Sequence, residues 1–177
     1  MTHPATRTGS LPGIATIDAA RWRGADDDDR AALAGELGDA CHQAGFFYLV
    51  GHGVEKALIE QCFNALAGFF ALPEPPKAAM DKANSPHFRG WERLGTELTG
   101  NRVDYREQVD LGPERKALAD PDPYYRRLIG PNQWPDPALA PGFRPAMERL
   151  AASLGEVATM LLEMMSVSLG LAPDHLA

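Results

Sequence analysis

Apolar residues recur at steps of three and four along the final segment of the chain, from Arg144 to Gly170. This spacing follows the 3.6-residue turn of an α-helix and places the apolar side chains on one face. We expect a single helix of about seven turns, roughly 35–40 Å long at 1.5 Å per residue. A stripe this short, without regular flanking charge pairs, favours packing against a domain over a coiled coil. The stripe consists of Met147, Leu150, Leu154, Val157, Leu161 and Met164.

Two further helices are expected in the first half of the chain. Four consecutive aspartates, residues 26–29, precede apolar positions at helical spacing. Carboxylates at this place accept the free N–H groups of a first turn, so we interpret the run as a helix start and not as a cation site. The second helix stops at "LPEPPK", because proline cannot continue a helix interior. The inward positions of the two helices are Leu33, Leu37, Ala40 and Cys41, and Leu58, Cys62, Leu66 and Phe69 or Phe70.

The segment "AGFFYLVGHGV", residues 44–54, connects these two helices. Gly45 is expected to end the first helix, and the aromatic and β-branched residues after it predict a buried strand. A shorter strand is expected at "IATID", residues 14–18. Residues 80–142 are irregular, with possible strands at "HFRGWERL" and "YREQVDLG". Loops of this length usually serve a function or lie against another part of the protein.

The order of these elements predicts an α+β fold. We expect a flexible N-terminus over residues 1–11, one domain over residues 12–142, and the long helix with the start of a following element over residues 143–177. After Gly170 ends the long helix, Pro173 and Asp174 resemble the start of another one. Because that element is begun and not finished, we expect the chain to be truncated.

The composition of the chain argues against several kinds of partner and cellular location. The chain has 177 residues and a formal net charge of −7, from 17 Lys and Arg against 24 Asp and Glu. An acidic chain without a basic stripe argues against nucleic acid or an anionic membrane surface as a partner. No apolar run approaches the length of a membrane span, and no secretion signal is recognisable. Two cysteines outside a CxxC motif are typical of a reducing, cytoplasmic environment.

His52 raises the question of a metal site, because it follows a strand and is flanked by Gly51 and Gly53. None of the five histidines has Asp or Glu two positions later, the spacing that points two ligands to the same side of a strand. Asp39 and His42 could share one helix face, but nothing nearby completes a ligand set. No phosphate-binding loop or nucleophile elbow is recognisable either. We therefore predict no metal ligand and no catalytic residue, and interpret "GHG" as a tight strand-to-helix turn.

Six motifs follow one another along the chain: "IATID", "AGFFYLVGHGV", "FFALPEPPK", "SPHFRGW", "DYREQVDLG" and "GPNQWP". In this order they resemble the N-terminal region of the isopenicillin N synthase-like family, whose members are Fe(II)- and 2-oxoglutarate-dependent oxygenases. The resemblance runs from about Pro12 to the end of the chain. It implies that residues 12–142 form a non-haem dioxygenase N-terminal domain, which normally packs on a double-stranded β-helix, or jelly roll. It further implies that the last helix braces this barrel, whose core is largely absent from the chain.

The resemblance also implies where the cofactors lie. In the family, iron is held by His-x-Asp and a distant His, and 2-oxoglutarate by Arg-x-Ser, all within the barrel. No position of this chain matches these motifs. We therefore expect the chain to bind no cofactor alone, with Fe(II) and 2-oxoglutarate belonging to the full-length family. The expected partners are the missing C-terminal jelly roll and, in the full enzyme, a small-molecule substrate.

A few side chains can be carried over from the resemblance. In relatives the segment that matches "SPHFRGW" reaches toward the substrate, so Arg89 is the first candidate to pair with a substrate carboxylate; a solvated surface arginine is the alternative. Trp91 and Tyr105 could line the same mouth or pack in the core or lid. Trp134 is expected to be the buried anchor of a rigid "GPNQWP" loop. Structural ion pairs are expected for Arg106, Glu107 and Asp110.

The expected function is that of the N-terminal portion of a 2-oxoglutarate/Fe(II)-dependent oxygenase. Such an enzyme hydroxylates, desaturates or cyclises a small molecule, and ethylene- and succinate-forming enzymes are among the relatives. We expect no turnover by this chain alone. The alternative is a free-standing, non-catalytic binding module that docks a partner barrel through the apolar face of the last helix. A third hypothesis is a metal-binding protein built on His42, His52 or His87.

Overall fold

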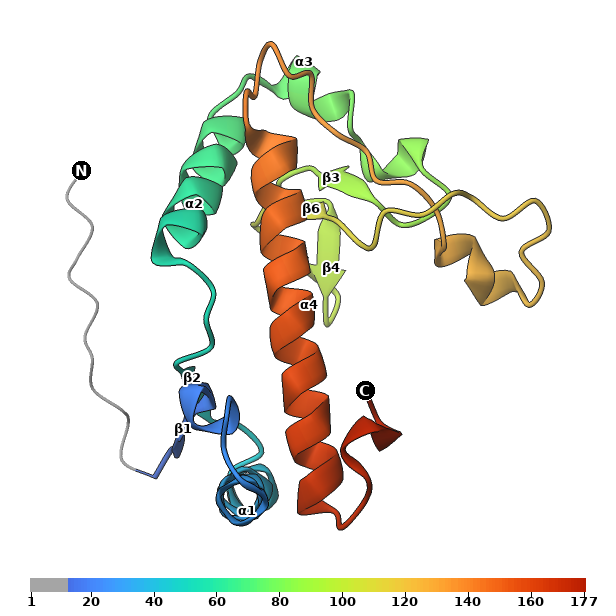
Figure 1. Cartoon of the computed structure of the whole chain (residues 1–177). Coiled ribbons are helices and arrows are strands. Elements are labelled where there is room, and N and C mark those ends of the chain that lie inside the picture. The colour runs from blue at the N-terminus through green and yellow to red at the C-terminus, as the bar shows by residue number, and fades with distance from the viewer. Residues whose placement is uncertain (1–12) are drawn as a thin grey trace. The chain divides into compact units, whose positions relative to one another are not determined.

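The chain folds into an α+β structure of helices and short strands (Figure 1). The computed structural model describes residues 13–177, with only the backbone described for residues 97–99; the predicted flexible N-terminus lies outside the described residues. Two compact units are present. Unit 1 comprises the described residues up to Val54 together with Ala152–Ala177, and unit 2 comprises Glu55–Ala151. The domain boundaries expected from the sequence stay a prediction.

Unit 1 is built around a parallel strand pair and the helix between its strands. Its elements are β1 (Thr16–Asp18), the 3-10 helix η1 (Ala19–Trp22), α1 (Asp27–Gln43), β2 (Tyr48–Val50), the last turns of α4 (Phe143–Ser168) and the 3-10 helix η4 (Pro173–His175). β1 and β2 pair with Ile17 opposite Leu49. Parallel strands need a long crossover connection, which η1 and α1 supply. The strand expected at "IATID" and the helix after the aspartates are confirmed.

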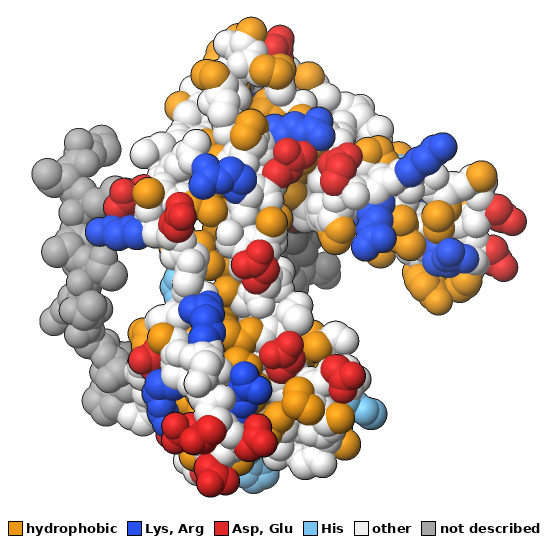
Figure 2. All heavy atoms as spheres, in the orientation of Figure 1, with side chains coloured by type: hydrophobic (Ala, Val, Ile, Leu, Met, Phe, Trp, Pro, Cys, Tyr) orange, Lys and Arg blue, Asp and Glu red, His pale blue; other side chains and the backbone are white. Residues whose placement is uncertain are grey.

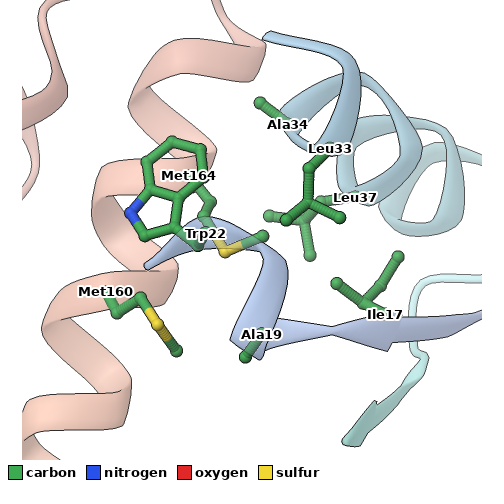
Figure 3. Packing of buried hydrophobic residues seen from close by; sticks show 8 residues of the cluster. All are labelled: Ile17, Ala19, Trp22, Leu33, Ala34, Leu37, Met160 and Met164. Atoms are coloured by element: carbon green, nitrogen blue, oxygen red, sulfur yellow. The ribbon is translucent and has the colours of Figure 1, made fainter. Parts of the chain in front are cut away.

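The core of unit 1 lies between α1, β1, η1 and the last turns of α4 (Figure 3). Leu33 and Leu37, one turn apart on α1, are fully buried, as is Met164 of α4. Burying an aliphatic side chain of this size contributes about 1.5–3 kcal/mol. The core cluster consists of Ile17, Ala19, Trp22, Leu33, Ala34, Leu37, Met160 and Met164.

The acidic run starts α1, as expected from the sequence. An Asp26 carboxylate oxygen accepts the backbone N–H of Asp29 at 2.9 Å, and the following aspartates occupy the first turn, near the positive end of the helix dipole. The inward position predicted for Cys41 is wrong, because its side chain is exposed. At about 100° per residue, Cys41 lies on the same side of α1 as Leu37 and Ala34, so its rotation does not explain its exposure. It lies in the last turn of α1, beyond the α1 residues that make up the core of unit 1.

The strand predicted over residues 46–50 is shorter and less buried than expected. β2 has only three residues and a single neighbour, β1. The side chains of Tyr48 and Val50 are 40% and 43% exposed, while Leu49 between them packs against the core. Successive side chains of a strand point to opposite faces. A strand with so many apolar residues is expected to be buried on both faces. In unit 1 only the face of β2 that carries Leu49 packs against the core.

Unit 2 contains two antiparallel strand pairs within the irregular segment. Its elements are α2 (Lys56–Phe70), α3 (Glu74–Ala78), η2 (Lys82–Asn84), β3 (Gly90–Glu92), β4 (Glu97–Thr99), β5 (Arg102–Asp104), β6 (Gln108–Asp110), η3 (Tyr124–Leu128) and the first turns of α4. β3 pairs with β6, with Trp91 opposite Val109, and β4 pairs with β5 as a hairpin. The strands expected in "HFRGWERL" and "YREQVDLG" are confirmed; α3 and the hairpin are additional.

The core of unit 2 is rich in aromatic side chains. The rings of Phe69 and Phe143 are both fully buried, with their centroids 5.1 Å apart. Cys62 is buried beside them, where its thiol donates to the carbonyl oxygen of Ala146 and burial raises the pKa of that thiol. The core cluster consists of Leu58, Cys62, Phe69, Met80, Trp91, Phe143, Ala146 and Met147.

The long C-terminal helix is confirmed as α4, with 26 residues. Its apolar stripe is covered mainly by the chain itself: Met147 and Leu150 belong to the core of unit 2, and the three positions from Val157 onward belong to that of unit 1. Leu154 is the exception and is 51% exposed. The free apolar face that the docking-module alternative requires is therefore covered for most of its length.

By length and composition α4 could also cross a membrane, which corrects the expectation that no apolar run is long enough. It is the one such helix among the described residues. The core helices of soluble proteins pass the same test. Met164 of α4 is fully buried in the core of unit 1, and 22% of the apolar window of α4 is buried within the described structure.

Replacing Asp26 with alanine should lower the free energy of unfolding by about 0.5–2 kcal/mol, because the substitution removes the acceptor for a first-turn N–H group of α1. Asp26→Asn keeps an oxygen at the same place and should cost much less. Urea-induced unfolding followed by circular dichroism measures both. An equal loss in the two variants would show that the charge of Asp26, and not its capping hydrogen bond, stabilises α1.

Candidate functional site

The predicted substrate-contact residues surround β3 and β6 in unit 2. β3 has a neighbour on each side, because the Trp91 N–H donates to the carbonyl oxygen of Met80 at 2.7 Å and β6 pairs along the other edge. Arg89 lies directly before β3, and Tyr105 lies in the turn between β5 and β6. The two neighbours of β3 therefore determine the direction in which the chain leaves Arg89.

A carboxylate beneath β3 joins three segments of unit 2. Glu107 accepts a hydrogen bond from the indole Nε1–H of Trp91 at 2.8 Å and an ion-paired one from Lys77 Nζ at 2.8 Å. Lys77 is only 8% exposed and also donates to the carbonyl oxygen of Phe70. Removing one partner of a buried ion pair typically costs about 3–5 kcal/mol, since the other charge is left unpaired. The interpretation of Glu107 as a structural ion-pair residue is confirmed.

A second ion-pair group connects the same strands from η2. Lys82 contacts both Glu92 of β3 and Asp110 of β6. Partial burial alone would lower the pKa of Lys82, but its hydrogen bonds to Asp110 and Glu92 outweigh burial and raise it. The hydrogen bond from Lys82 holds the pKa of Glu92 below its usual value. The structural ion pair expected for Asp110 is thus confirmed, as is that of Arg106, which pairs with Asp104 at 3.2 Å.

Charged side chains of both signs are interspersed over the described residues on the face shown in Figure 2. This distribution agrees with ion pairs such as Arg93 with Glu74 and Arg144 with Glu148. Most of these pairs are exposed to solvent, where each contributes about 0–1 kcal/mol. The ion pairs of Lys77 and Lys82 are the more buried ones, with lysine side chains 10% and 15% exposed.

The guanidinium of Arg89 is held by backbone carbonyl groups. Its Nη1 donates to the carbonyl oxygens of His87 and Phe88 at 3.0 and 3.1 Å, and Nη2 donates to that of Leu128 at 3.2 Å. Nε is buried and has no hydrogen-bond partner among the described residues. The guanidinium lies against Gly112, where a Cβ atom would come within 2.3 Å of Nη2. Arg89 is therefore half-buried and held in place, with part of its donor set unused.

Two amides of "GPNQWP" position this arginine, and the sequence did not single them out. Asn132 exchanges two hydrogen bonds of 2.8 Å with the backbone of Gly112. Gln133 donates to the carbonyl oxygens of Arg89 at 2.7 Å and Asp81 at 2.9 Å. The sequence analysis recognised the motif but predicted Trp134 as its anchor, because aromatic residues commonly anchor loops.

The aromatic candidates have different surroundings. Trp91 is buried in the core of unit 2, and Tyr105 is 80% exposed. Trp134 is half-buried against the same core, with its ring near Phe143. Its indole N–H donates to Glu114. Burial alone would raise the pKa of Glu114, but its hydrogen bonds from Asn132 and Trp134 lower it.

The "GHG" turn lies in unit 1 and its histidine caps the turn. Nδ1 of His52 accepts the backbone N–H of Val54 at 3.1 Å. Gly51 has φ +62°, and a Cβ atom there would lie 2.1 Å from an Asp18 carboxylate oxygen. Gly53 also has a positive φ, of +84°. These contacts agree with the interpretation of Gly51, His52 and Gly53 as a structural motif.

The described residues do not fit an iron site. No group of three or more His, Cys, Asp or Glu side chains that could hold a metal ion occurs in residues 13–177 as described. A two-histidine, one-carboxylate iron site needs three such ligands on one side of the metal. The expectation that this chain binds no Fe(II) by itself stays a prediction.

Comparison with known families bears directly on these motifs. A family model described as "non-haem dioxygenase in morphine synthesis N-terminal" matches residues 14–137. The chain belongs to this family. The matched range contains β1, β2 and the whole β3–β6 region, so the strand order and the arginine-bearing segment are parts of the family's N-terminal domain.

Curated relatives are dioxygenases of greater length. The chain is 32% identical over 165 residues to the 2-oxoglutarate-dependent dioxygenase frbJ of Dothideomycetidae sp. (strain 11243), covering 93% of this chain and 44% of that protein. It is 34% identical over 173 residues to the validamycin A dioxygenase of Streptomyces hygroscopicus subsp. limoneus, covering 94% of this chain and 45% of that protein. The chain therefore spans less than half the length of these relatives.

Solved structures show the same fold. A full-length protein from Neurospora crassa, solved in complex with alpha-KG, matches with a TM-score of 0.74 and 22% identity, over 92% of this chain and 49% of that one. A putative 2OG-Fe(II) oxygenase family protein from Caulobacter crescentus matches with a TM-score of 0.69 and 24% identity, over 92% of this chain and 50% of that one. At these identities the likeness concerns the fold alone.

Gly90→Ala should lower the free energy of unfolding by about 2–4 kcal/mol, from backbone strain and overpacking together. Gly90 has φ +119°, and a Cβ atom would lie 2.2 Å from the carbonyl oxygen of Met80 and 2.4 Å from Gln133 Nε2. Gly155→Ala in α4 is the control: no atom lies within 4 Å of its Cβ position, so stability should rise by about 1 kcal/mol. Urea unfolding measures both, and a Gly90→Ala protein of unchanged stability would contradict the tight approach around β3.

Acid should destabilise unit 2 partly through Glu92. Because the folded pKa of Glu92 is lowered from 4.5, its contribution is fully present above about pH 4.5 and is lost as the pH falls through the folded value. Glu92→Gln cannot be protonated, so its free energy of unfolding should decline less steeply below about pH 4.5. Urea unfolding at a series of pH values measures the slopes. Identical slopes in the two proteins would contradict this role of Glu92.

Proposed function

We propose that this chain is the N-terminal portion of a 2-oxoglutarate/Fe(II)-dependent oxygenase that acts on a small molecule. The observation that carries the proposal is the family match over residues 14–137, together with curated dioxygenase relatives of which the chain spans 44–45%. Hydroxylation, desaturation, cyclisation, and ethylene or succinate formation all remain within the proposed reaction class. A cytoplasmic location belongs to the same proposal, supported by two cysteines that are both free thiols.

The proposal places the reacting centre outside this chain. Neither His-x-Asp, His-x-Glu nor Arg-x-Ser occurs in its sequence. We propose that a jelly-roll barrel supplies the ligands for Fe(II) and 2-oxoglutarate, and that the chain alone does not turn over substrate. Its own residues would then bind and orient substrate and exclude water at the mouth of the barrel.

Within this proposal, Arg89 is the residue for a substrate anion. A guanidinium has five N–H groups, and backbone carbonyls accept three hydrogen bonds from Arg89. Nε is buried, so the remaining Nη2 hydrogen is the donor that the proposal gives to a substrate carboxylate. Tyr105, with its exposed ring, is the proposed aromatic wall. Trp91 would not contact substrate. Its buried ring would hold β3 in place and so position the neighbouring Arg89.

The alternative, a free-standing module that docks a partner barrel through the last helix, has less support. It needs a free apolar stripe on the last helix, and the chain itself covers most of that stripe. The large apolar side chains of α4 and the turn after it that remain exposed include Leu154, Leu162 and Leu169. The metal-protein hypothesis is disfavoured because no group of potential ligands surrounds His42, His52 or His87 in the described structure.

Sequencing the DNA downstream of this reading frame and assaying succinate release test the proposal. The purified 177-residue chain, supplied with Fe(II) and 2-oxoglutarate, should release no succinate. The downstream DNA should encode His-x-Asp…His…Arg-x-Ser, and the continuous protein should release succinate. Iron-dependent succinate release by the short chain alone would contradict the proposal, as would downstream DNA that lacks these motifs in every frame.

The continuous protein also allows a test of Arg89. Arg89→Gln should raise KM for a carboxylate-bearing substrate by about tenfold or more, because the charged pair is lost. Arg93→Gln is the matched control, since Arg93 is exposed and paired with Glu74, and it should leave KM unchanged. Equal KM values for Arg89→Gln and the parent would remove Arg89 from the proposed substrate contacts without affecting the proposed enzyme class.

A further inference from the structure

Unit 1 contains a pocket of about 330 Å³ that the proposed oxygenase role does not use. One wall is a single face of α4, where the lining residues fall at steps of three and four from Ser153 to Glu163. The opposite wall comes from η1, the first turn of α1 and the "GHG" turn. A pocket of this size is at the lower end of the range for small-molecule sites. The residues that carry the argument are Trp22, Arg30, His52, Glu156, Met160 and Glu163.

Arg30 is the unexplained cation of this pocket. Its guanidinium lies 5.4 Å from the centroid of the Trp22 ring, an arrangement that holds it in place. Its Nε is buried, and within the described chain Arg30 has neither an ion pair nor a side-chain hydrogen bond. Nε is closed off from the pocket, so a ligand carboxylate would accept from the two Nη groups, which have no partner among the described residues.

Carboxylates lie on the α4 wall of the same pocket. Glu163 accepts the indole N–H of Trp22 at 3.3 Å. Glu156 has no hydrogen bond or ion pair within residues 13–177 as described, and it lies two turns before Glu163 on the same helix face. Glu156 is therefore available to an ammonium group, while Arg30 is available to an anion.

The other polar groups of the lining limit the ligand further. Arg23 is occupied, because it donates to the carbonyl oxygens of Gly51 and His52. Because Nδ1 of His52 accepts the Val54 N–H, the neutral ring carries its proton on Nε2, as a further donor. Two arginines and two glutamates leave the lining without net charge. A lone anion or a lone cation would meet an equal number of repelling charges, whereas a zwitterion would not.

We propose that this pocket binds a free amino acid with an apolar side chain. The carboxylate would pair with Arg30 and the ammonium group with Glu156. The side chain would lie against the apolar part of the lining, which comprises Trp22, Val54, Val157 and Met160 (Figure 3 shows Trp22 and Met160).

Titration of the isotope-labelled full chain with L-leucine, followed by nuclear magnetic resonance, tests the proposal. L-Leucine up to about 10 mM, a range that includes weak small-ligand affinities, should shift the indole N–H signal of Trp22. The signals of Trp91 and Trp134, both in unit 2, should not move. Isocaproate, which is leucine without its ammonium group, and isopentylamine, which is leucine without its carboxylate, should each bind at least about tenfold more weakly.

Three variants separate this site from unspecific effects. Arg30→Gln and Glu156→Gln should each weaken leucine binding by about tenfold or more, because each removes one of the two paired charges. Arg21→Gln is the matched control: Arg21 is exposed, pairs with Glu36 and does not line the pocket. It should leave leucine binding unchanged. Isocaproate binding as tightly as L-leucine, or no movement of the Trp22 signal with L-leucine, would overturn the proposal.

Discussion

The carboxylate of Glu107 is the contact on which the organisation of unit 2 depends. It joins Lys77 from the segment after α2, Trp91 from β3 and its own position before β6. Both Trp91 and the Lys77 side chain are nearly excluded from solvent, so each polar group needs its partner inside the protein. β3 is held between β6 and Met80, which fixes the backbone next to Arg89. Asn132 and Gln133 hold the same region through hydrogen bonds to the backbone of Gly112 and of Arg89.

Unit 1 depends on a different set of polar contacts. Asp18 caps η1, Arg23 binds the carbonyl oxygens of the "GHG" turn, and Trp22 covers the core while its indole N–H contacts Glu163. The turn therefore has a structural cause that needs no metal. The same backbone geometry also places Trp22, Arg30 and His52 around one pocket.

Much of the secondary structure was predictable, because it depends on the local spacing of apolar residues and on the residues that start and end helices. The stripe of α4, the aspartates before α1 and the prolines after α2 each act within a few residues of their own position. The predictions were wrong where burial was decided by distant partners. Cys41 is exposed although it fits helical spacing, and β2 is half-exposed although its residues are strongly apolar. At the candidate site, Arg89 was identified by resemblance, whereas the contacts of Asn132 and Gln133 connect residues 18 to 53 positions apart and have no periodic signal.

The sequence by itself determined the class of the chain. Its ordered motifs placed it among non-haem dioxygenase N-terminal domains, and its lack of His-x-Asp and Arg-x-Ser motifs follows from the residues alone. Only the tertiary structure decided which polar side chains are already satisfied. Glu107 and Lys77 satisfy each other, three carbonyl oxygens occupy part of Arg89, and Arg30 and Glu156 keep charges that no described group of the chain pairs. The physical reason is that a charge is balanced by whatever lies within a few ångströms of it in space, and separation along the chain does not report that distance.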